Sequence, residues 1–295
     1  MKRMRLHLIS VICLFAVLFT VGCFFDLNLS SAIASSGNEF ALGVSSIGVL
    51  PGHIVLSMIG GFCLYEAFKD KIKTFLKVIF FCFGCACASV ADVMAGSEIF
   101  GVNGFYGVLP EWVGYLIVLP VICASAFLGF KIYQRAELKG RIALIIIVGV
   151  MAATIMLIGG VFIKLIFRRP RFRAIDAYGI PFVRVFSRFD NYKEYMEKFG
   201  ILSDEFKSFP SGHTATSAVF PCFVVFLPLI KREYEKIQLN LFYFGVIFTL
   251  FVAYNRILAG AHFLTDIAFG GLLAFTCAFI TNEITIRLKV FQNND

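Results

Sequence analysis

Long runs of apolar residues, separated by short polar segments, recur along the whole chain. A helix needs about 20 residues to cross a bilayer, because the hydrocarbon core is about 30 Å thick and a helix rises about 1.5 Å per residue. The hydropathy pattern predicts about eight spans, at residues 7–26, 46–68, 75–97, 112–131, 142–164, 212–230, 238–256 and 263–285. We therefore expect an all-α fold, a polytopic transmembrane helical bundle.

The composition agrees with this expectation. The 295 residues are 59% hydrophobic and 16% charged, whereas soluble domains have roughly 45–50% and about 25%. The first run, MKRMRLHLISVICLFAVLF, also fits a signal peptide. However, the following TVGC has Thr20 where a lipoprotein cleavage site usually has Leu, so we expect a retained helix. All nine cysteines lie in predicted spans, and the C-x-x-C-x-C at 82–87 has no nearby His or acidic residue to complete a metal site.

The basic residues predict the orientation of the chain. With the N-terminus inside, the inside segments carry 16 of the 27 lysines and arginines, and the short outside loops 27–45 and 98–111 carry none. This is the positive-inside pattern of membrane proteins, so the net charge of +8 reflects topology and does not indicate nucleic-acid binding. The other basic residues lie in the outside segment 164–211 or at Arg256. That departure from the rule points to chemistry on the outside face.

The long polar segment 164–211 mixes basic residues with Phe and Tyr. Loops of this length between packed elements are usually functional. The rings suit headgroup depth in a bilayer, and the same composition suits a mouth for an anionic substrate with a lipid tail. Within it, NYKEYMEKF predicts a short amphipathic helix on the membrane.

Two basic or turn-forming clusters border this segment. At its start, Lys164 is followed by a group of arginines, the side chain best suited to bidentate contact with phosphate oxygens. At its end, the sequence FPSGH leads into an apolar run, so Ser211, Gly212 and His213 begin a helix. Free backbone N–H groups and the positive end of the helix dipole make such a terminus a natural anion site.

A third cluster is NRILAGAHFLTDIAFGG, residues 255–271. His262 and Asp266 are four residues apart and share one face of a helix. An Asp that accepts the Nδ1 hydrogen of a His leaves Nε2 free as a nucleophile or base. A buried His–Asp pair is sometimes only structural, but ionisable residues within membranes are functional by default because burying them is costly. All three clusters lie at outside ends of predicted spans, and their residues suit phosphoryl transfer through a phosphohistidine.

These residues resemble the signatures of the type 2 phosphatidic acid phosphatase superfamily, the integral-membrane relatives of vanadium haloperoxidases. Its second signature, P-S-G-H, is intact at 210–213, and its third, S-R-x5-H-x3-D, reads Asn255, Arg256, His262 and Asp266. The first, K-x6-R-P, fits Lys164 and Arg171 with Phe in place of Pro. Arg169, which precedes Pro170, is the alternative clamp at a different spacing.

The resemblance implies a role for each matching residue. His262 would attack phosphorus, Asp266 would orient it, and His213 would protonate the leaving oxygen and later activate water. Five groups would bind the phosphate oxygens, namely Lys164, Arg171, Ser211, Gly212 and Arg256. The resemblance implies no metal and no other cofactor.

The family core has six helices, with its first signature after the third, so two N-terminal spans of this chain are additional. We expect these helices within residues 1–110 and the phosphatase core at 111–290. His53 and Asp92, which lie within or near the additional helices, are expected to be satisfied packing residues. The implied function is a lipid phosphate phosphatase acting on phosphatidic acid, phosphatidylglycerol phosphate, undecaprenyl diphosphate or a lipid A-type headgroup. A phosphotransferase of the same fold and a non-catalytic protein that binds anionic lipid are the alternatives. We expect a bacterial cytoplasmic membrane, an active site on the extracytoplasmic face and membrane lipids as partners; the oligomeric state stays open.

Overall fold

The computed structural model describes residues 1–69, 72–100, 111–136 and 140–288. In these residues every regular element is a helix, and seven helices are long and apolar enough to cross a membrane. The protein is therefore a polytopic helical bundle, as the hydropathy pattern predicts.

The long elements follow the predicted spans closely. They are α1 (Met4–Ile33), α2 (Glu39–Gly48) continued by α3 (Leu50–Ala67), α4 (Thr74–Phe100), α5 (Glu111–Gln134), α6 (Arg141–Leu157) continued through a π-helical turn (Ile158–Phe162) into α7 (Ile163–Phe167), α12 (Glu235–Leu258) and α13 (Leu264–Arg287). The polar segment carries α8 (Phe172–Tyr178), α9 (Tyr192–Phe199) and a 3-10 turn (Ser203–Phe206). The short helix predicted from NYKEYMEKF is confirmed by α9.

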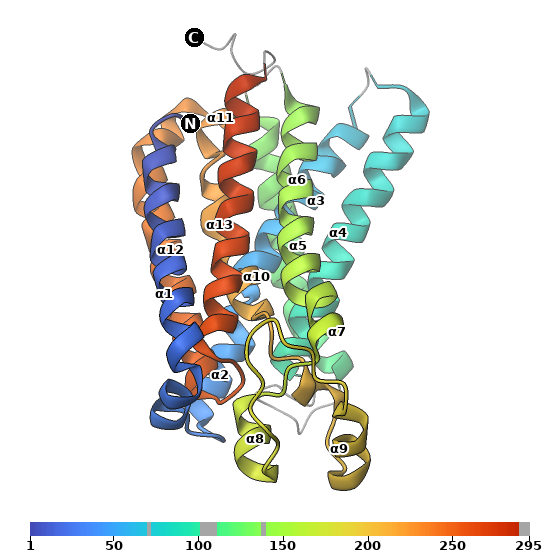
Figure 1. The fold of residues 1–295 in the computed structure, drawn as a ribbon. Helices are drawn as coiled ribbons and strands as arrows, with labels where there is room; N and C mark the ends of the chain where they lie inside the picture. The colour runs from blue at the N-terminus through green and yellow to red at the C-terminus, as the bar shows by residue number, and fades with distance from the viewer. Residues whose placement is uncertain (70–71, 101–110, 137–139, 289–295) are drawn as a thin grey trace.

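The predicted span 212–230 differs from the expectation. It forms two shorter helices, α10 (Gly212–Val224) and α11 (Leu227–Ile230), and so is not among the seven long ones. Pro228 lies in the first turn of α11. Because proline has no backbone N–H, it cannot donate to the Val224 carbonyl and continue α10. The two pieces still carry the chain from one end of the bundle to the other (Figure 1).

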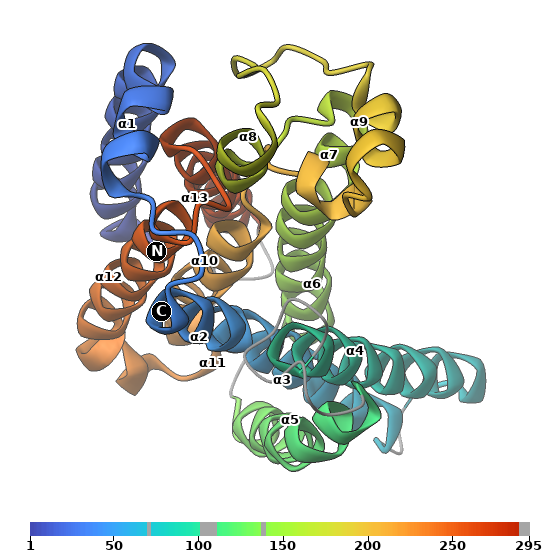
Figure 2. The same cartoon turned by 90° about the horizontal axis from the view of Figure 1, so that it is seen from below.

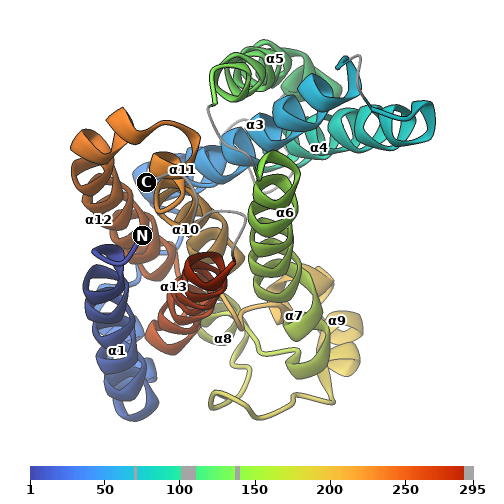
Figure 3. The ribbon, with the colours of Figure 1, turned by 90° about the horizontal axis from the view of Figure 1, so that it is seen from above.

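The start of α1 and the last turns of α13 lie at one end of the bundle, and α8, α9 and their loops lie at the other (Figure 1). Seen along the bundle, α3, α4 and α5 pack together on one side and α1 packs against α13 on the other (Figures 2 and 3). The central helix is α10, which contacts α3, α6, α12 and α13. The division predicted at residue 110 stays a prediction; in the packing, α5 groups with α3 and α4.

A glycine brings α1 against the start of α13. A Cβ atom on Gly22 would lie only 2.8 Å from the backbone nitrogen of Thr265, so a larger residue would push the helices apart. One turn further along α1, Asp26 reaches the same nitrogen and accepts its hydrogen bond at 2.9 Å. Further along the same pair of helices, Phe15 of α1 stacks on Phe275 of α13 with ring centroids 5.6 Å apart. The N-terminal helix is thus fastened to the end of α13 that carries Asp266.

Candidate active site

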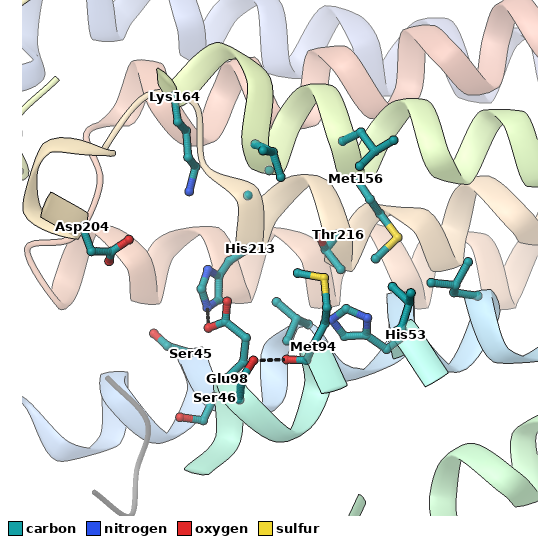
Figure 4. Close-up of a pocket in the computed structure, with 18 of the residues that line it drawn as sticks. Ser45, Ser46, His53, Met94, Glu98, Met156, Lys164, Asp204, His213 and Thr216 are labelled. Carbon is teal, nitrogen blue, oxygen red and sulfur yellow. Dashed lines mark hydrogen bonds and ion pairs between the residues drawn. The ribbon is translucent and has the colours of Figure 1, made fainter. Parts of the chain in front are cut away.

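The ends of α7, α10 and α12 meet around one cavity of about 570 Å³. Five of the residues predicted from the motifs line it: Lys164, Arg171, Gly212, His213 and Arg256. Lys164 and His213 lie in the same part of the pocket, with Asp204 beside them (Figure 4). Residues of all three sequence clusters therefore meet at the end of the bundle opposite the start of α1, although Ser211, His262 and Asp266 do not line the cavity.

The start of α10 is held tightly beside a cation. A Cβ atom on Gly212 would lie only 3.2 Å from the Cα of Gly160, so glycine lets the first turn of α10 pack closely against the π-helical turn. The same Cβ position is 3.4 Å from the Lys164 Nζ atom, which places the ammonium beside the start of α10. Ser211 is the N-cap residue, and its hydroxyl accepts a hydrogen bond from the hydroxyl of Thr214 at 3.0 Å. Ser211 is fully buried and does not line the cavity, so its predicted contact with phosphate remains a prediction.

The guanidinium groups of Arg171 and Arg256 are buried at this cavity. Arg171 donates to Asp204 through Nη2 at 2.6 Å. Among the described residues, neither its Nε nor the Nε of Arg256 has a hydrogen-bond acceptor. Buried donors are nearly always paired, so two unpaired guanidinium nitrogens beside one cavity indicate a place for an anion.

Asp204 adds a negative charge to this basic group. Burial alone would raise the pKa of its carboxyl, but the neighbouring charges of Arg171 and Lys164 hold that pKa below its ordinary value. Asp204 is therefore ionised at neutral pH and orients Arg171. The cavity lining contains four basic side chains against the two carboxylates of Asp204 and Glu98, which leaves it positive.

His213 has a partner that lies far from it in sequence. Its Nε2 atom lies 3.3 Å from Oε2 of Glu98, near the end of α4 (Figure 4). A carboxylate beside an imidazole stabilises the protonated ring and limits its rotation. The sequence offered no local signal for this contact, because the residue lies in a segment expected to be an ordinary outside loop.

His262 lies in the turn between α12 and α13 and is fully buried. Its Nδ1 atom is 2.6 Å from the backbone carbonyl of Ser208, whereas the nearest Asp266 oxygen is 3.7 Å away. The expectation that Asp266 accepts the Nδ1 hydrogen is therefore corrected: the Ser208 carbonyl accepts it. In the described part of the chain, His262 Nε2 has no hydrogen-bond partner. Burial, together with the positive charges of Arg256 and Lys164, lowers the pKa of His262, which favours a neutral ring.

Asp266 acts on His262 through the surrounding turn. One of its oxygens accepts hydrogen bonds from the Ser208 hydroxyl and, at 2.8 Å, from the backbone N–H of Phe263, the residue after His262. Its other oxygen accepts from Arg169 at 2.6 Å. The carboxylate thus holds both the residue that follows His262 and the residue whose carbonyl accepts its proton.

Arg169 and Arg171 have different environments. Arg169 is 1% exposed, lies outside the cavity lining and bridges Asp266 to Asp26 of α1, with Nη2 2.9 Å from the Asp26 carboxylate. Arg171 lines the cavity. The motif spacing favours Arg171, which lines the cavity, whereas Arg169 takes a structural position; the role of Arg171 as the phosphate clamp stays a prediction.

Two residues of the N-terminal half lie at or near the candidate site, which their sequence context does not predict. Asp26 falls at the end of the first predicted span, yet a carboxylate in an apolar run signals a buried partner. His53 is expected from the sequence to be a satisfied packing residue. It lines the cavity instead, and its Nδ1 has no hydrogen-bond partner within the residues that the structure describes.

Residues 143–288 match the model of the PAP2 superfamily. This part of the chain belongs to the PAP2 superfamily. The superfamily in general comprises phosphatases, which supports phosphatase-type activity for the protein at that broad level. No curated protein and no solved structure matches the chain. The match begins after α5, so Glu98, Asp26 and His53 all lie outside it.

Proposed function

We propose that the protein hydrolyses the phosphate monoester or pyrophosphate of a membrane lipid through a phosphohistidine intermediate. The observation that carries the proposal is the pair of buried, unpaired guanidinium nitrogens in the described residues, on Arg171 and Arg256, which line one positive cavity. The unpaired Nε2 of His262 is not in that lining, but His262 lies close enough for the charges of Arg256 and Lys164, which line the cavity, to lower its pKa. A phosphate group supplies the oxygens that the two guanidinium groups lack. It also supplies an electrophile for the free Nε2 of His262.

In the first step, the Nε2 lone pair of His262 attacks phosphorus and the bond from phosphorus to the lipid oxygen breaks. His213 donates a proton to that leaving oxygen, and Glu98 keeps the imidazole oriented for the transfer. The Ser208 carbonyl accepts the Nδ1 hydrogen of His262, so the nitrogen that attacks carries no proton. Lys164, Arg171, Arg256 and the N–H groups at the start of α10 stabilise the charge that spreads over the remaining oxygens.

In the second step, His213 removes a proton from water, and the resulting nucleophile attacks the phosphohistidine. The bond from phosphorus to His262 Nε2 breaks and inorganic phosphate leaves. Both imidazoles then have their starting protonation. The cationic side chains perform the charge stabilisation that a metal ion supplies in other phosphatases.

The test is phosphate release by the purified protein in EDTA on phosphatidic acid, phosphatidylglycerol phosphate, undecaprenyl diphosphate and a lipid A phosphate. We expect release from at least one lipid and a loss of more than about a thousandfold in His262→Ala and His213→Ala, because both groups take part in the bond changes. The control is His7→Ala, since His7 lies on α1 and contacts Tyr243 away from the cavity.

The result separates hydrolysis from its alternatives. Transfer of the phosphoryl group to an added alcohol, with little free phosphate, indicates a phosphotransferase. Equal release by the wild type and His262→Ala refutes the assignment of the nucleophile.

A further inference from the structure

The charged residues occupy only one end of the cavity. At the other end the lining is mainly apolar and comes from α3, α4 and α6, including Leu56, Phe83, Val90, Met94, Met156 and Leu157. Met156 lies away from Lys164 and Asp204, with His213 and Glu98 between the two ends (Figure 4). The site therefore continues into an apolar cleft, which we define by these six residues.

The cleft is long enough for a hydrocarbon chain. Glu98 and Phe83 both line the cavity and are fifteen residues apart on α4. At about 1.5 Å per residue this is about 22 Å along the helix. One leaflet of the hydrocarbon core is half of about 30 Å, so the cleft reaches as deep as a lipid tail whose headgroup lies at the charged end.

The walls of the cleft favour an apolar occupant. Phe83, Val90 and Leu157 are each about half exposed, with 51%, 48% and 49% of their surfaces accessible. Water needs two to four polar partners to occupy an internal site. On this side of the cavity the labelled polar side chains are those of His53 and Thr216, and the other labelled side chains there are methionines (Figure 4). An occupant that is anionic at one end and apolar at the other satisfies both parts of the cavity together.

We propose that the cleft binds one hydrocarbon chain of the phosphorylated substrate and that its depth sets the length of chain accepted. The inference rests on the proposed function and adds a second subsite to it. Because α3 and α4 lie outside the residues that match the superfamily, it also gives the N-terminal helices a role, since they supply one wall of the tail site.

Two alanines allow the cleft to be filled without touching the charged end. Ala86 on α4 and Ala153 on α6 both line the cavity; Ala86 is twelve residues from Glu98, and Ala153 is eleven residues from Lys164 on α7. Replacing either one by Phe places a ring where the distal part of the tail would lie. Cys85→Phe is the matched control, since Cys85 is next to Ala86 and is exposed as Ala86 is, but does not line the cavity.

The first readout locates the tail directly and does not depend on turnover. A phosphatidate with a photoreactive diazirine near the end of one acyl chain is irradiated with each protein, and the labelled residues are mapped by mass spectrometry. We expect labels on α4 and α6 around Ala86 and Ala153, lost in Ala86→Phe, retained in Cys85→Phe and displaced by unlabelled phosphatidate but not by phosphatidylcholine. Labels spread over the outer faces of α1 and α5, or displaced equally by both lipids, overturn the proposal.

The second readout compares tails at a constant headgroup. For Ala86→Phe and Ala153→Phe we expect kcat/KM for dioleoyl phosphatidate to fall about tenfold or more, with dihexanoyl phosphatidate and p-nitrophenyl phosphate within about twofold of wild type. An equal loss on all three substrates, or none, refutes the tail site. If the wild type hydrolyses none of them, the proposed function fails while the labelling experiment still decides the cleft.

Discussion

Replacing Asp26 by Ala removes a carboxylate that joins α1 to the active-site turn. The side chain is 5% exposed, and its oxygens accept hydrogen bonds from Arg169 Nη2 at 2.9 Å, from the Thr265 backbone N–H at 2.9 Å and from the Thr265 hydroxyl. Asp26→Ala leaves the first two donors without this acceptor in a site that water does not reach. We expect a protein that still inserts but is substantially less stable.

The loss in the free energy of unfolding depends on which acceptors the donors keep after Asp26 is removed. Removing one partner of a buried ion pair costs about 3–5 kcal/mol. Arg169 keeps its contact with Asp266 at 2.6 Å, so the low end of that range, about 3 kcal/mol, is appropriate. For a chain of this size each kcal/mol lowers the melting temperature by about 2–4 °C, which gives a decrease of about 6–12 °C.

The assay is thermal unfolding in one detergent, followed by the near-ultraviolet signal and by loss of phosphate release. Asp26→Asn should lie between the wild type and Asp26→Ala, because the amide retains one oxygen acceptor. The matched control is Asp190→Ala: its ion pair with Arg188 is exposed, at 71% and 63% of the two side chains, and such pairs contribute about 0–1 kcal/mol. Equal melting temperatures for Asp26→Ala and Asp190→Ala would show that the buried network does not hold α1 in place.

Three further predictions concern the cavity. Glu98→Gln should lower kcat by about tenfold while KM changes little, because a hydrogen bond to a charged group contributes about 1.5–3 kcal/mol and this one orients His213 for proton transfer. Glu98→Asp keeps the carboxylate and should restore part of the lost kcat. An unchanged kcat in Glu98→Gln, or no recovery in Glu98→Asp together with a large change in KM, would contradict that role. Asp204→Asn should lower the melting temperature at pH 7, and the difference from wild type should shrink as the pH falls below about 4. The folded-state pKa of Asp204 is depressed, so its contribution is present above the unfolded pKa and is lost as pH falls through the folded value. The rate of phosphate release should be the same in EDTA and in added Mg²⁺. A rate that falls in EDTA and recovers when Mg²⁺ is added would refute the idea that side chains alone stabilise the charge on the phosphate oxygens.

The spacing of the motifs predicts five of the residues that meet at the cavity, whereas Ser211, His262 and Asp266 do not line it. Lys164, Arg171, Gly212, His213 and Arg256 come from three segments, yet counting odd and even spans placed them on one face. That inference works because a spanning helix has only two ends and short loops leave little freedom. The helical character of the chain was likewise evident, since apolar runs of this length have no other stable form in a membrane.

The contacts between distant segments were not predictable in the same way. The acceptor for the His262 proton is a backbone carbonyl 54 residues away, and no residue type marks such a carbonyl. The four-residue spacing of His262 and Asp266 suggested a direct bond, but His262 precedes the first turn of α13 and so does not follow helical geometry. Glu98 approaches His213 through the packing of α4 near α10, which hydropathy does not encode. The break between α10 and α11 is predictable only if Pro228 is interpreted as a helix-ending residue within an otherwise apolar run.

The buried bridge from Asp26 through Arg169 to Asp266 also has a consequence for how the chain is made. Asp26 is synthesised 143 residues before Arg169 and 239 before Thr265. During that interval α1 carries a carboxylate into the membrane with neither of these partners, at the energetic cost that unpaired charge has there. Only when the last helix arrives is the carboxylate neutralised by its full set of donors. A chain that stops short of α13 therefore lacks the Thr265 donors of Asp26 and the Asp266 carboxylate that shares Arg169 with it.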